Sequence, residues 1–588
     1  MNFSAPLDYC RQIGWRGAHD GTGMMGSKYV NMPNLPAGSC YPHMAGPSDT
    51  SSQNRDSVNL LYTLPYLPTY LSIYIPSHIN ASLHVQSSAS LLISCKQRAP
   101  FHYFLDSELT LKVTYTCALL PNFLNFFLQS PLESFEMSFS SKSHSGPSSN
   151  ISIIIVGAGF AGLTAAIECD RKGHSVLLLE KSSHLSPLGD IISFGQNSSR
   201  VLAKWPGVMA KLDPLVHRAE EFHYHDWTGR FVSTQSFVEE HKAWGKRING
   251  HRGEIHNVVY QHAAVERRVD IRLGKNVVRY FEDEKMEMAG VETEDGEVFT
   301  ADLVLAAEGV RSRARGLVLG MEDMPRASGY AVFRAWFSSE EILANPRTRF
   351  LVEKGDTHNG WIGQDVHFLV ASIKNGKEIS WVCTHKDDGK IEESWQFPGK
   401  VEDVLKVVRE EDGWDPVVLD LVKATPPDRL FDYKLVFRDP LPTFISPCAR
   451  TVLIGDAAHP FLPTSIQGAS QAMEDGVVMA ACLDRAGKEK VTEAVRVWER
   501  IRYERVHNIQ KTGVVTREQW HKADWDKIWK DPKSIHLKRE EWILNFDPEE
   551  DAYRSYDAVR DRLEKGENTV WETDRTHSAE VVVVGGGV

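Results

Sequence analysis

The stretch ISIIIVGAGFAGLTAAIEC, residues 151–169, decides the fold. Its first six residues form an almost unbroken apolar run, which is typical of a strand buried on both faces. A glycine-rich turn follows, and then an alanine-rich segment typical of a helix. A second apolar run, SVLLLE, occupies residues 175–180. This order of strand, turn, helix and strand predicts a βαβ unit.

The glycine-rich turn predicts a dinucleotide site. Gly157, Gly159 and Gly162 have the GxGxxG spacing, a weak signal alone that gains weight from the strand before it and the helix after it. Glycines let the backbone approach a pyrophosphate, and a helix N-terminus offers free N–H groups and a positive dipole end. Glu180 ends the second strand, where a carboxylate accepts hydrogen bonds from ribose hydroxyls and repels a 2′-phosphate. An ADP-containing dinucleotide is therefore expected, with FAD and NAD both open.

A second motif, LIGDAAHPFLPTSIQGASQAMEDG, occupies residues 453–476. Asp456 follows a buried apolar run, at the sheet edge where ligands of α/β proteins gather. Its carboxylate could accept a hydrogen bond from a ribityl hydroxyl. Gly468 and Ala469 open a helix whose dipole could stabilise negative charge on a reduced flavin. An ordinary strand–loop–helix connection explains the same pattern equally well.

Three motifs in this order carry a specific resemblance. They are GAGFAG with Glu180, AAEGVRSRAR at 306–315 and GDAAHP at 455–460. Together they resemble the single-component (class A) FAD-dependent aromatic hydroxylases, and most of all the fungal salicylate-hydroxylase-like enzymes. The resemblance implies an α/β fold: an FAD-binding Rossmann-like three-layer domain, an inserted mixed β-sheet substrate domain and a helical C-terminus.

The resemblance also implies roles for single residues. Glu180 is expected to bind the adenosine ribose and Asp456 the ribityl chain. Gly468 and Ala469 are expected to place backbone N–H groups near the flavin ring, and Arg252 is expected near the flavin phosphates.

Two further features follow from the same resemblance. Residues 189–200 resemble the segment that lies against the flavin. Arg334 resembles an arginine of the substrate sheet, and we expect it to hold a phenolate or carboxylate through a charge-assisted pair. A strand arginine on a solvated face explains Arg334 equally well. His459 is expected to pack beside the flavin rather than act as a base.

The resemblance implies a monooxygenase reaction. NADPH or NADH reduces FAD during a transient visit, and O₂ then adds to the flavin C4a to give a hydroperoxide, whose distal oxygen attacks a phenolic or aromatic-acid substrate. An epoxidase or another secondary-metabolism monooxygenase acting on a non-aromatic substrate is an alternative. A non-catalytic flavin-binding protein is another, motivated by Glu308, which stands where the family usually has Asp.

Shifts in composition predict the domain boundaries. Residues 1–149 are rich in Ser and Pro and are expected to form a disordered extension and linker, although Met137 offers a second natural-looking start. The FAD-binding domain is expected in two parts, 150–325 and 441–487, around a substrate-domain sheet at 326–440. A helical C-terminal region is expected at 488–588.

Composition argues against several other function classes. The formal net charge of −12 argues against nucleic-acid binding. None of the eight cysteines forms a CxxC pair, so neither a zinc site nor a disulfide framework is expected, and a cytoplasmic setting fits. No metal is expected at His223 and His225, which lack a third ligand. The most apolar window, Val113 to Leu128, is interrupted by Pro121, so no membrane attachment is expected. The expected partners are a small aromatic molecule and O₂, with a monomer or a homodimer left open.

Overall fold

The computed structural model describes residues 149–185, 189–320, 325–387, 389 and 397–566, together with three strands nearer the N-terminus. The chain divides into two compact units, Met1–Ser141 and Lys142–Val588. In the first unit, β1 (Val58–Thr63), β3 (Ser90–Cys95) and β2 (Ala81–Gln86) pair in that order as an antiparallel sheet. The window at 113–128 and Met137 lie outside the described residues. The predicted disorder of residues 1–149 stays a prediction.

The second unit is built on a five-stranded parallel sheet, which includes the predicted βαβ unit. Its strand order is β10-β5-β4-β14-β20. The predicted strand at 298–306 is in fact two strands, because Asp302 interrupts it and its carboxylate accepts hydrogen bonds from the N–H and hydroxyl of Ser152, both at 2.7 Å. The five strands are β4 (Ser152–Val156), β5 (Ser175–Glu180), β10 (Asp270–Leu273), β14 (Leu303–Ala306) and β20 (Thr451–Leu453).

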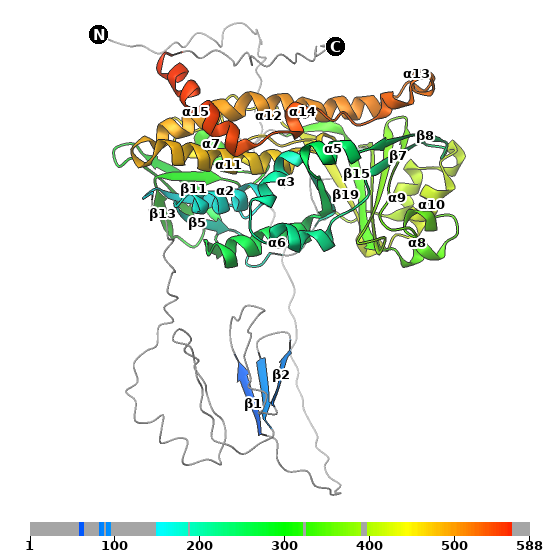
Figure 1. Cartoon of the computed structure of the whole chain (residues 1–588), viewed down its shortest axis with the longest axis horizontal. Helices are drawn as coiled ribbons and strands as arrows, with labels where there is room; N and C mark the ends of the chain where they lie inside the picture. Colours follow the sequence, from blue (N-terminus) through cyan, green and yellow to red (C-terminus); the bar gives the residue numbers. More distant parts are fainter. Residues whose placement is uncertain are drawn as a thin grey trace, which may run out of the picture. The chain divides into compact units, whose positions relative to one another are not determined.

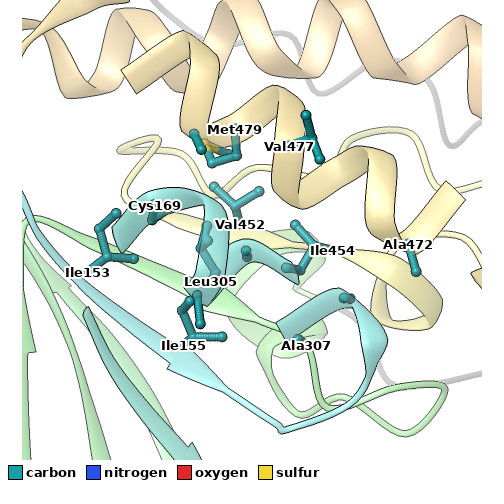
Figure 2. Close-up of a cluster of buried hydrophobic side chains, with 14 of the residues drawn as sticks. Ile153, Ile155, Cys169, Leu305, Ala307, Val452, Ile454, Ala472, Val477 and Met479 are labelled. Atoms are coloured by element: carbon teal, nitrogen blue, oxygen red, sulfur yellow. The ribbon is translucent and has the colours of Figure 1, made fainter. Parts of the chain in front are cut away.

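Helices cover one face of this sheet and a small antiparallel sheet contacts its strands as a third layer (Figure 1). The third layer is formed by β11 (Val277–Asp283), β12 (Met288–Thr293) and β13 (Val298–Ala301). Helices α2 (Phe160–Arg171) and α11 (Gly468–Ala486) pack so closely that a Cβ at Gly476 would lie 2.6 Å from the backbone nitrogen of Ala165. Figure 2 shows the buried side chains that gather here, among them Ile153, Cys169, Leu305, Val452 and Met479.

A seven-stranded mixed sheet forms the predicted substrate domain, with the order β19-β15-β18-β17-β16-β7-β8. Strand β16 pairs with β7 in parallel, and the other neighbours are antiparallel. The predicted range 326–440 leaves out β7 and β8, because the polar alternation at 221–226 indicates a strand but not its partner. The strands are β7 (Glu221–Asp226), β8 (Phe231–Ser236), β15 (Arg326–Ser338), β16 (His358–Gly363), β17 (Val366–Ile373), β18 (Glu378–Lys386) and β19 (Leu430–Phe437).

Short segments connect the two sheets. β6 (Ile191–Phe194) and β9 (Ile248–His251) form a two-stranded antiparallel sheet. In the chain, β6 directly precedes the helix α3 (Gln196–Ala203), and β9 directly precedes the helix α6 (Arg252–Gln261). Three helices pack on one face of the seven-stranded sheet, around a core that includes Trp361 and Trp381. They are α8 (Glu340–Ala344), α9 (Val401–Val407) and α10 (Pro416–Lys423). The described part of the chain before α11 also contains α4 (Val208–Leu212), α5 (Val238–Trp244) and α7 (Ala314–Leu319).

The C-terminal part is helical as far as it is described, and the predicted fold class is confirmed. Helix α12 (Val491–His521) has 31 residues and contacts α11 as well as β16 and β17. It is followed by α13 (Trp525–Lys530), α14 (Glu541–Leu544) and α15 (Pro548–Glu564). Among the residues that the structure describes, no helix is both long and apolar enough to cross a bilayer.

Candidate active site

The three glycines of the first motif serve different purposes. Gly157 has φ +106, and a Cβ there would lie 2.4 Å from the carbonyl oxygen of Ala307. A Cβ at Gly162 would lie 1.9 Å from the carbonyl oxygen of Gly157. Gly159, by contrast, would meet nothing within 4 Å. The first and third glycines are therefore required by packing, and the open side of the turn lies at Gly159, where a pyrophosphate can approach.

Glu180 lies beside this turn, as predicted for a ribose ligand. Its Oε2 accepts a hydrogen bond from the N–H of Ala158 at 2.8 Å, and its Oε1 accepts one from the N–H of Ser182 at 2.8 Å. These two bonds fix the carboxylate at the end of β5. Each carboxylate oxygen has further lone pairs that ribose hydroxyls can use.

Asp456 lies just beyond β20, in a single helical turn at Gly455–Ala457. Its side chain is exposed, yet protein surrounds it closely enough that burial raises the pKa of its carboxyl, an effect opposed by the charges of His459 and Arg252. Within the described residues, its carboxylate oxygens accept no hydrogen bond. An unpartnered carboxylate at a strand end suits the hydroxyls of a ribityl chain.

Helix α11 begins at Gly468, directly after this loop, and the residue before it provides no side-chain cap. The side chain of Gln467 instead accepts a hydrogen bond from the Nδ2 of Asn197 at 3.1 Å. Within the described residues the N–H groups of Gly468 and Ala469 therefore have no side-chain cap, and they can donate to a ligand. The N–H of Gly195 donates to the hydroxyl of Ser470 at 3.1 Å, which places the predicted flavin-side segment against this helix end.

Arg252 opens helix α6 and lies near Asp456. Its backbone N–H donates to the carbonyl oxygen of Asp190 at 2.8 Å. Burial lowers the pKa of its guanidinium, and the charges of Asp456 and Asp190 oppose this effect. A Cβ at Gly189 would lie 2.8 Å from the Cβ of Arg252, so the backbone at 189 packs directly on this side chain. The arrangement suits a cation near the cofactor's phosphates.

These features fit FAD as the group that the site holds. Gly159 leaves room for a pyrophosphate, two long helices present uncapped N-termini, and carboxylates stand at both expected hydroxyl positions. The structure brings together Gly157, Gly159, Gly162, Glu180, Arg252, Asp456, Gly468 and Ala469 around the carboxyl ends of β4, β5 and β20 and the helices that follow.

Arg334 lies on β15 and is only 4% exposed. The alternative interpretation, in which it lies on a solvated face, is therefore wrong. Its guanidinium forms an ion pair with Asp190, and Phe431 lies below it at 5.5 Å. Asp190 was not predicted as its partner. The ion pair connects the substrate sheet to the flavin-side segment, and the role of Arg334 toward a substrate stays a prediction.

Sequence reasoning missed a buried ionic network behind the Asp456 loop. Asp475 accepts hydrogen bonds from the N–H of Gly455 at 2.8 Å, from the Nε2 of His459 at 2.6 Å and from the Nε of Arg502 at 2.8 Å. It therefore holds the loop in place. His459 thus contributes to the network that holds this loop, and its expected position beside the flavin stays a prediction.

The adjacent Glu474 completes the network. It pairs with Arg502, accepts from the Nε of Arg505 at 2.8 Å and accepts from the Nδ2 of Asn197 at 2.6 Å. Two carboxylates in the middle of an apolar helix were the signal that could have revealed it, since buried charges require partners.

The middle motif supports the same loop. Arg315 is buried and donates to the carbonyl oxygens of Ala457 at 2.8 Å and Asp456 at 3.0 Å. Glu308 accepts a hydrogen bond from the hydroxyl of Ser312 at 2.7 Å. The side chain of Glu308, which is longer than the usual Asp, is thus hydrogen-bonded to a residue of the same motif.

Replacing Asp456 with Asn is expected to weaken FAD binding about 10- to 100-fold, because a hydrogen bond to a charged acceptor contributes about 1.5–3 kcal/mol. Titration of apoprotein with FAD, followed by flavin fluorescence, measures the effect. Asp439→Asn is the matched control, since Asp439 is an exposed carboxylate paired with Arg326 at 2.8 Å. Equal affinities for the two variants would contradict the assignment.

Comparisons with known proteins agree with this site. A family model described as an FAD binding domain matches residues 150–502. Asperlicin C monooxygenase from Petromyces alliaceus is 38% identical over 424 residues, which cover 70% of this chain and 89% of the relative. The FAD-dependent monooxygenase nanF from Aspergillus nanangensis is 36% identical, covering 71% and 92%.

Solved structures share the fold. The crystal structure of CtdE with FAD and substrate 4 is 34% identical with a TM-score of 0.66, and it covers 71% of this chain and 100% of CtdE. A salicylate hydroxylase substrate complex, at 22% identity and a TM-score of 0.57, covers 70% and 98% and shows the fold alone. The predicted FAD cofactor is confirmed. The chain therefore belongs to the FAD-binding-domain family and is an FAD-dependent monooxygenase.

Proposed function

We propose that this monooxygenase uses NADPH or NADH together with O₂ to hydroxylate a phenolic or aromatic-acid substrate. The observation that carries the proposal is the sheet face beside the Asp190–Arg334 ion pair. Tyr330 and Val332 share that face of β15 with Arg334, because side chains alternate along a strand. Tyr330 and Val332 also pack with the buried Tyr433 of β19. Aromatic and apolar groups next to a buried cation suit a ring that carries an acidic hydroxyl.

The bound FAD would supply electron storage and oxygen activation, and the chain would supply binding, orientation and exclusion of water. Glu180, Asp456 and Arg252 hold the cofactor's two halves. The N–H groups at Gly468 and Ala469 stabilise negative charge on the ring. A guanidinium has five N–H donors. Arg334 can therefore keep its ion pair with Asp190 and also donate a hydrogen bond to a substrate oxygen, which makes it the proposed catalytic residue.

A second candidate function is oxygenation of a larger, non-aromatic substrate, including epoxidation. The 38% identity to asperlicin C monooxygenase favours it, because that relative is named for asperlicin C and not for a phenol or an aromatic acid. Product analysis separates the two candidates: consumption of a phenol from a mixed panel supports the first, and oxygenation without loss of any phenol supports the second.

Anaerobic reduction of the holoprotein tests the proposal. NADPH or NADH should bleach the visible flavin spectrum, and a phenol or aromatic acid that fits the site should accelerate bleaching at least about tenfold, equivalent to about 1.4 kcal/mol. Each candidate ligand is added to a separate sample, with a buffer-only sample as control. A flavin spectrum that neither dinucleotide bleaches would instead indicate a non-catalytic flavin-binding protein.

A further inference from the structure

Arg247 is a half-buried cation that forms no ion pair in the described part of the chain. It directly precedes β9, and its Nη2 lacks a hydrogen-bond partner there. Its guanidinium lies 3.8 Å from the centre of the Phe237 ring. Burial lowers the pKa of Arg247 to about 9, so the group keeps its charge at neutral pH. Buried polar groups are normally paired, which makes this one a candidate ligand-binding group.

The carboxylate whose charge acts on Arg247 is already bound elsewhere. Glu240 accepts hydrogen bonds from the Nη2 and Nε of Arg539 at 2.6 and 2.9 Å, and from the Nε2 of Gln196 at 2.5 Å. The negative charge of Glu240 therefore acts on two guanidinium groups, those of Arg247 and Arg539. Because one carboxylate cannot neutralise both cations, this group of three side chains keeps a net positive charge.

Other orphaned polar atoms lie beside Arg247. His217 donates its Nδ1–H to the carbonyl oxygen of Ser372 at 2.7 Å, which leaves its Nε2 as a bare acceptor. That Nε2, the Nδ1 of His358 and the Oδ1 of Asn249 are all buried without hydrogen-bond partners among the described residues. The two imidazole rings are 5.6 Å apart, and the N–H of His217 donates to the carbonyl oxygen of Asn249 at 2.8 Å.

Both histidines are neutral acceptors at physiological pH. Burial, helped by the positive charge of Arg247, lowers the pKa of His217 to about 4. Burial also lowers the pKa of His358 well below its usual value. Leaving such atoms unpaired costs about 1–3 kcal/mol each. A ligand that offers an anionic oxygen to Arg247 and an adjacent O–H or N–H to His217 or Asn249 removes this cost.

The cluster is connected to the flavin end of the site. Arg247 and Arg252 flank the two ends of β9, a separation of about 16 Å at 3.3 Å per residue. Gln196, which binds Glu240, follows Gly195, whose N–H donates to Ser470 in the first turn of α11. A substrate anchored at Arg247 can therefore extend toward the flavin.

We propose that Arg247, with His217 and Asn249, binds an anionic oxygen of the substrate, a carboxylate or an acidic hydroxyl remote from the oxygenated carbon. The inference rests on the proposed function. It differs from the role of Arg334, whose guanidinium is shared with Asp190. The substrate class is therefore an acid that is long enough to span from β9 to the flavin.

Matched acid and amide pairs test the inference. The FAD-loaded protein is titrated with phenol- and indole-terminated alkanoic acids long enough to span this separation, and with the corresponding alkanamides, and the shift of the visible flavin spectrum gives each affinity. Wild-type protein should bind at least one acid about tenfold or more tightly than its amide. Arg247→Gln should abolish the preference, and Arg247→Lys should restore part of it. Lys246→Gln, which removes an exposed neighbouring charge, should leave the preference unchanged.

Each outcome decides the inference. A wild-type protein with no acid preference, or an Arg247→Gln variant that keeps it, overturns the role of Arg247. If Arg247→Gln does not fold, the wild-type preference and the Arg247→Lys titration decide. Failure of the proposed function looks different, because absence of flavin, or flavin that NAD(P)H never bleaches, is detected before any acid is added.

Discussion

Replacement of Arg502 with leucine is expected to lower the free energy of unfolding by about 3–5 kcal/mol, because removing one partner leaves buried charges uncompensated. The side chains of Arg502, Glu474 and Asp475 are all 0% exposed. Leucine fills part of the volume but offers no donor to either carboxylate. The Gly455 loop, which Asp475 holds, should loosen with it, and FAD affinity should fall in parallel.

Urea unfolding of the FAD-free protein, followed by tryptophan fluorescence, measures the change. Arg496→Leu is the control on the same helix, since Arg496 is exposed and, within the part of the chain that the structure describes, donates only to the carbonyl oxygen of Thr492. It should change the free energy of unfolding by no more than about 0.5 kcal/mol. Similar losses for the two variants would show that the buried network contributes little.

The same network predicts how wild-type stability depends on acid. Burial alone would raise the pKa of Glu474, but Arg505 and Arg502 outweigh it and lower that pKa to about 2, from an ordinary value of 4.5. A depressed folded-state pKa stabilises the protein above the unfolded value and loses that contribution as the pH falls through the folded value. Stability should therefore decline as the pH falls from 4.5 to about 2. This decline should be smaller in Arg502→Leu, because loss of Arg502 brings the folded-state pKa of Glu474 closer to the unfolded value.

Gly162→Ala is expected to abolish FAD binding and to destabilise the chain by about 1–3 kcal/mol or more, as overpacking does. The new Cβ would lie 1.9 Å from the carbonyl oxygen of Gly157, an atom of the backbone that no rotamer change can move. Helix α2 must then shift away from the turn. The N–H groups that face the pyrophosphate would move with it.

Gly159→Ala provides the matched comparison, since its Cβ meets nothing within 4 Å. The apoprotein should unfold at the wild-type temperature, while FAD binding weakens about tenfold or more, because the methyl group occupies the approach of the pyrophosphate. Thermal unfolding and FAD titration of both variants separate packing from binding. A Gly162→Ala protein with normal thermal stability would contradict the role of that glycine.

Local sequence was enough to predict the cofactor half of the fold. The apolar run before Gly157 and the one that ends at Glu180 form neighbouring parallel strands, in the register Ile154 to Leu177. These features depend on residues close together in the chain, where hydrophobic period and turn chemistry act directly. The strand around 298–306 was predicted too long, because the hydrogen bonds of Asp302 to Ser152 bridge 150 positions.

The parts of the site that escaped prediction are pairings between distant residues. Asp190 and Arg334 are 144 positions apart, and Arg315 reaches the carbonyl oxygen of Ala457 over 142 positions. No spacing rule links such pairs, since their contact depends on the tertiary fold. The buried charges of Glu474 and Arg502 were visible as residue types, but their partners were not.

The parallel pairing of β7 with β16 has a consequence for recombination between relatives. The register joins Tyr224 to Gly360, so a strand encoded early in the gene is hydrogen-bonded into a sheet encoded much later. A chimaera that exchanges only residues 326–440 splits this sheet between two parents. To exchange substrate preference between homologues, a chimaera must therefore include residues 221–236 together with residues 326–440.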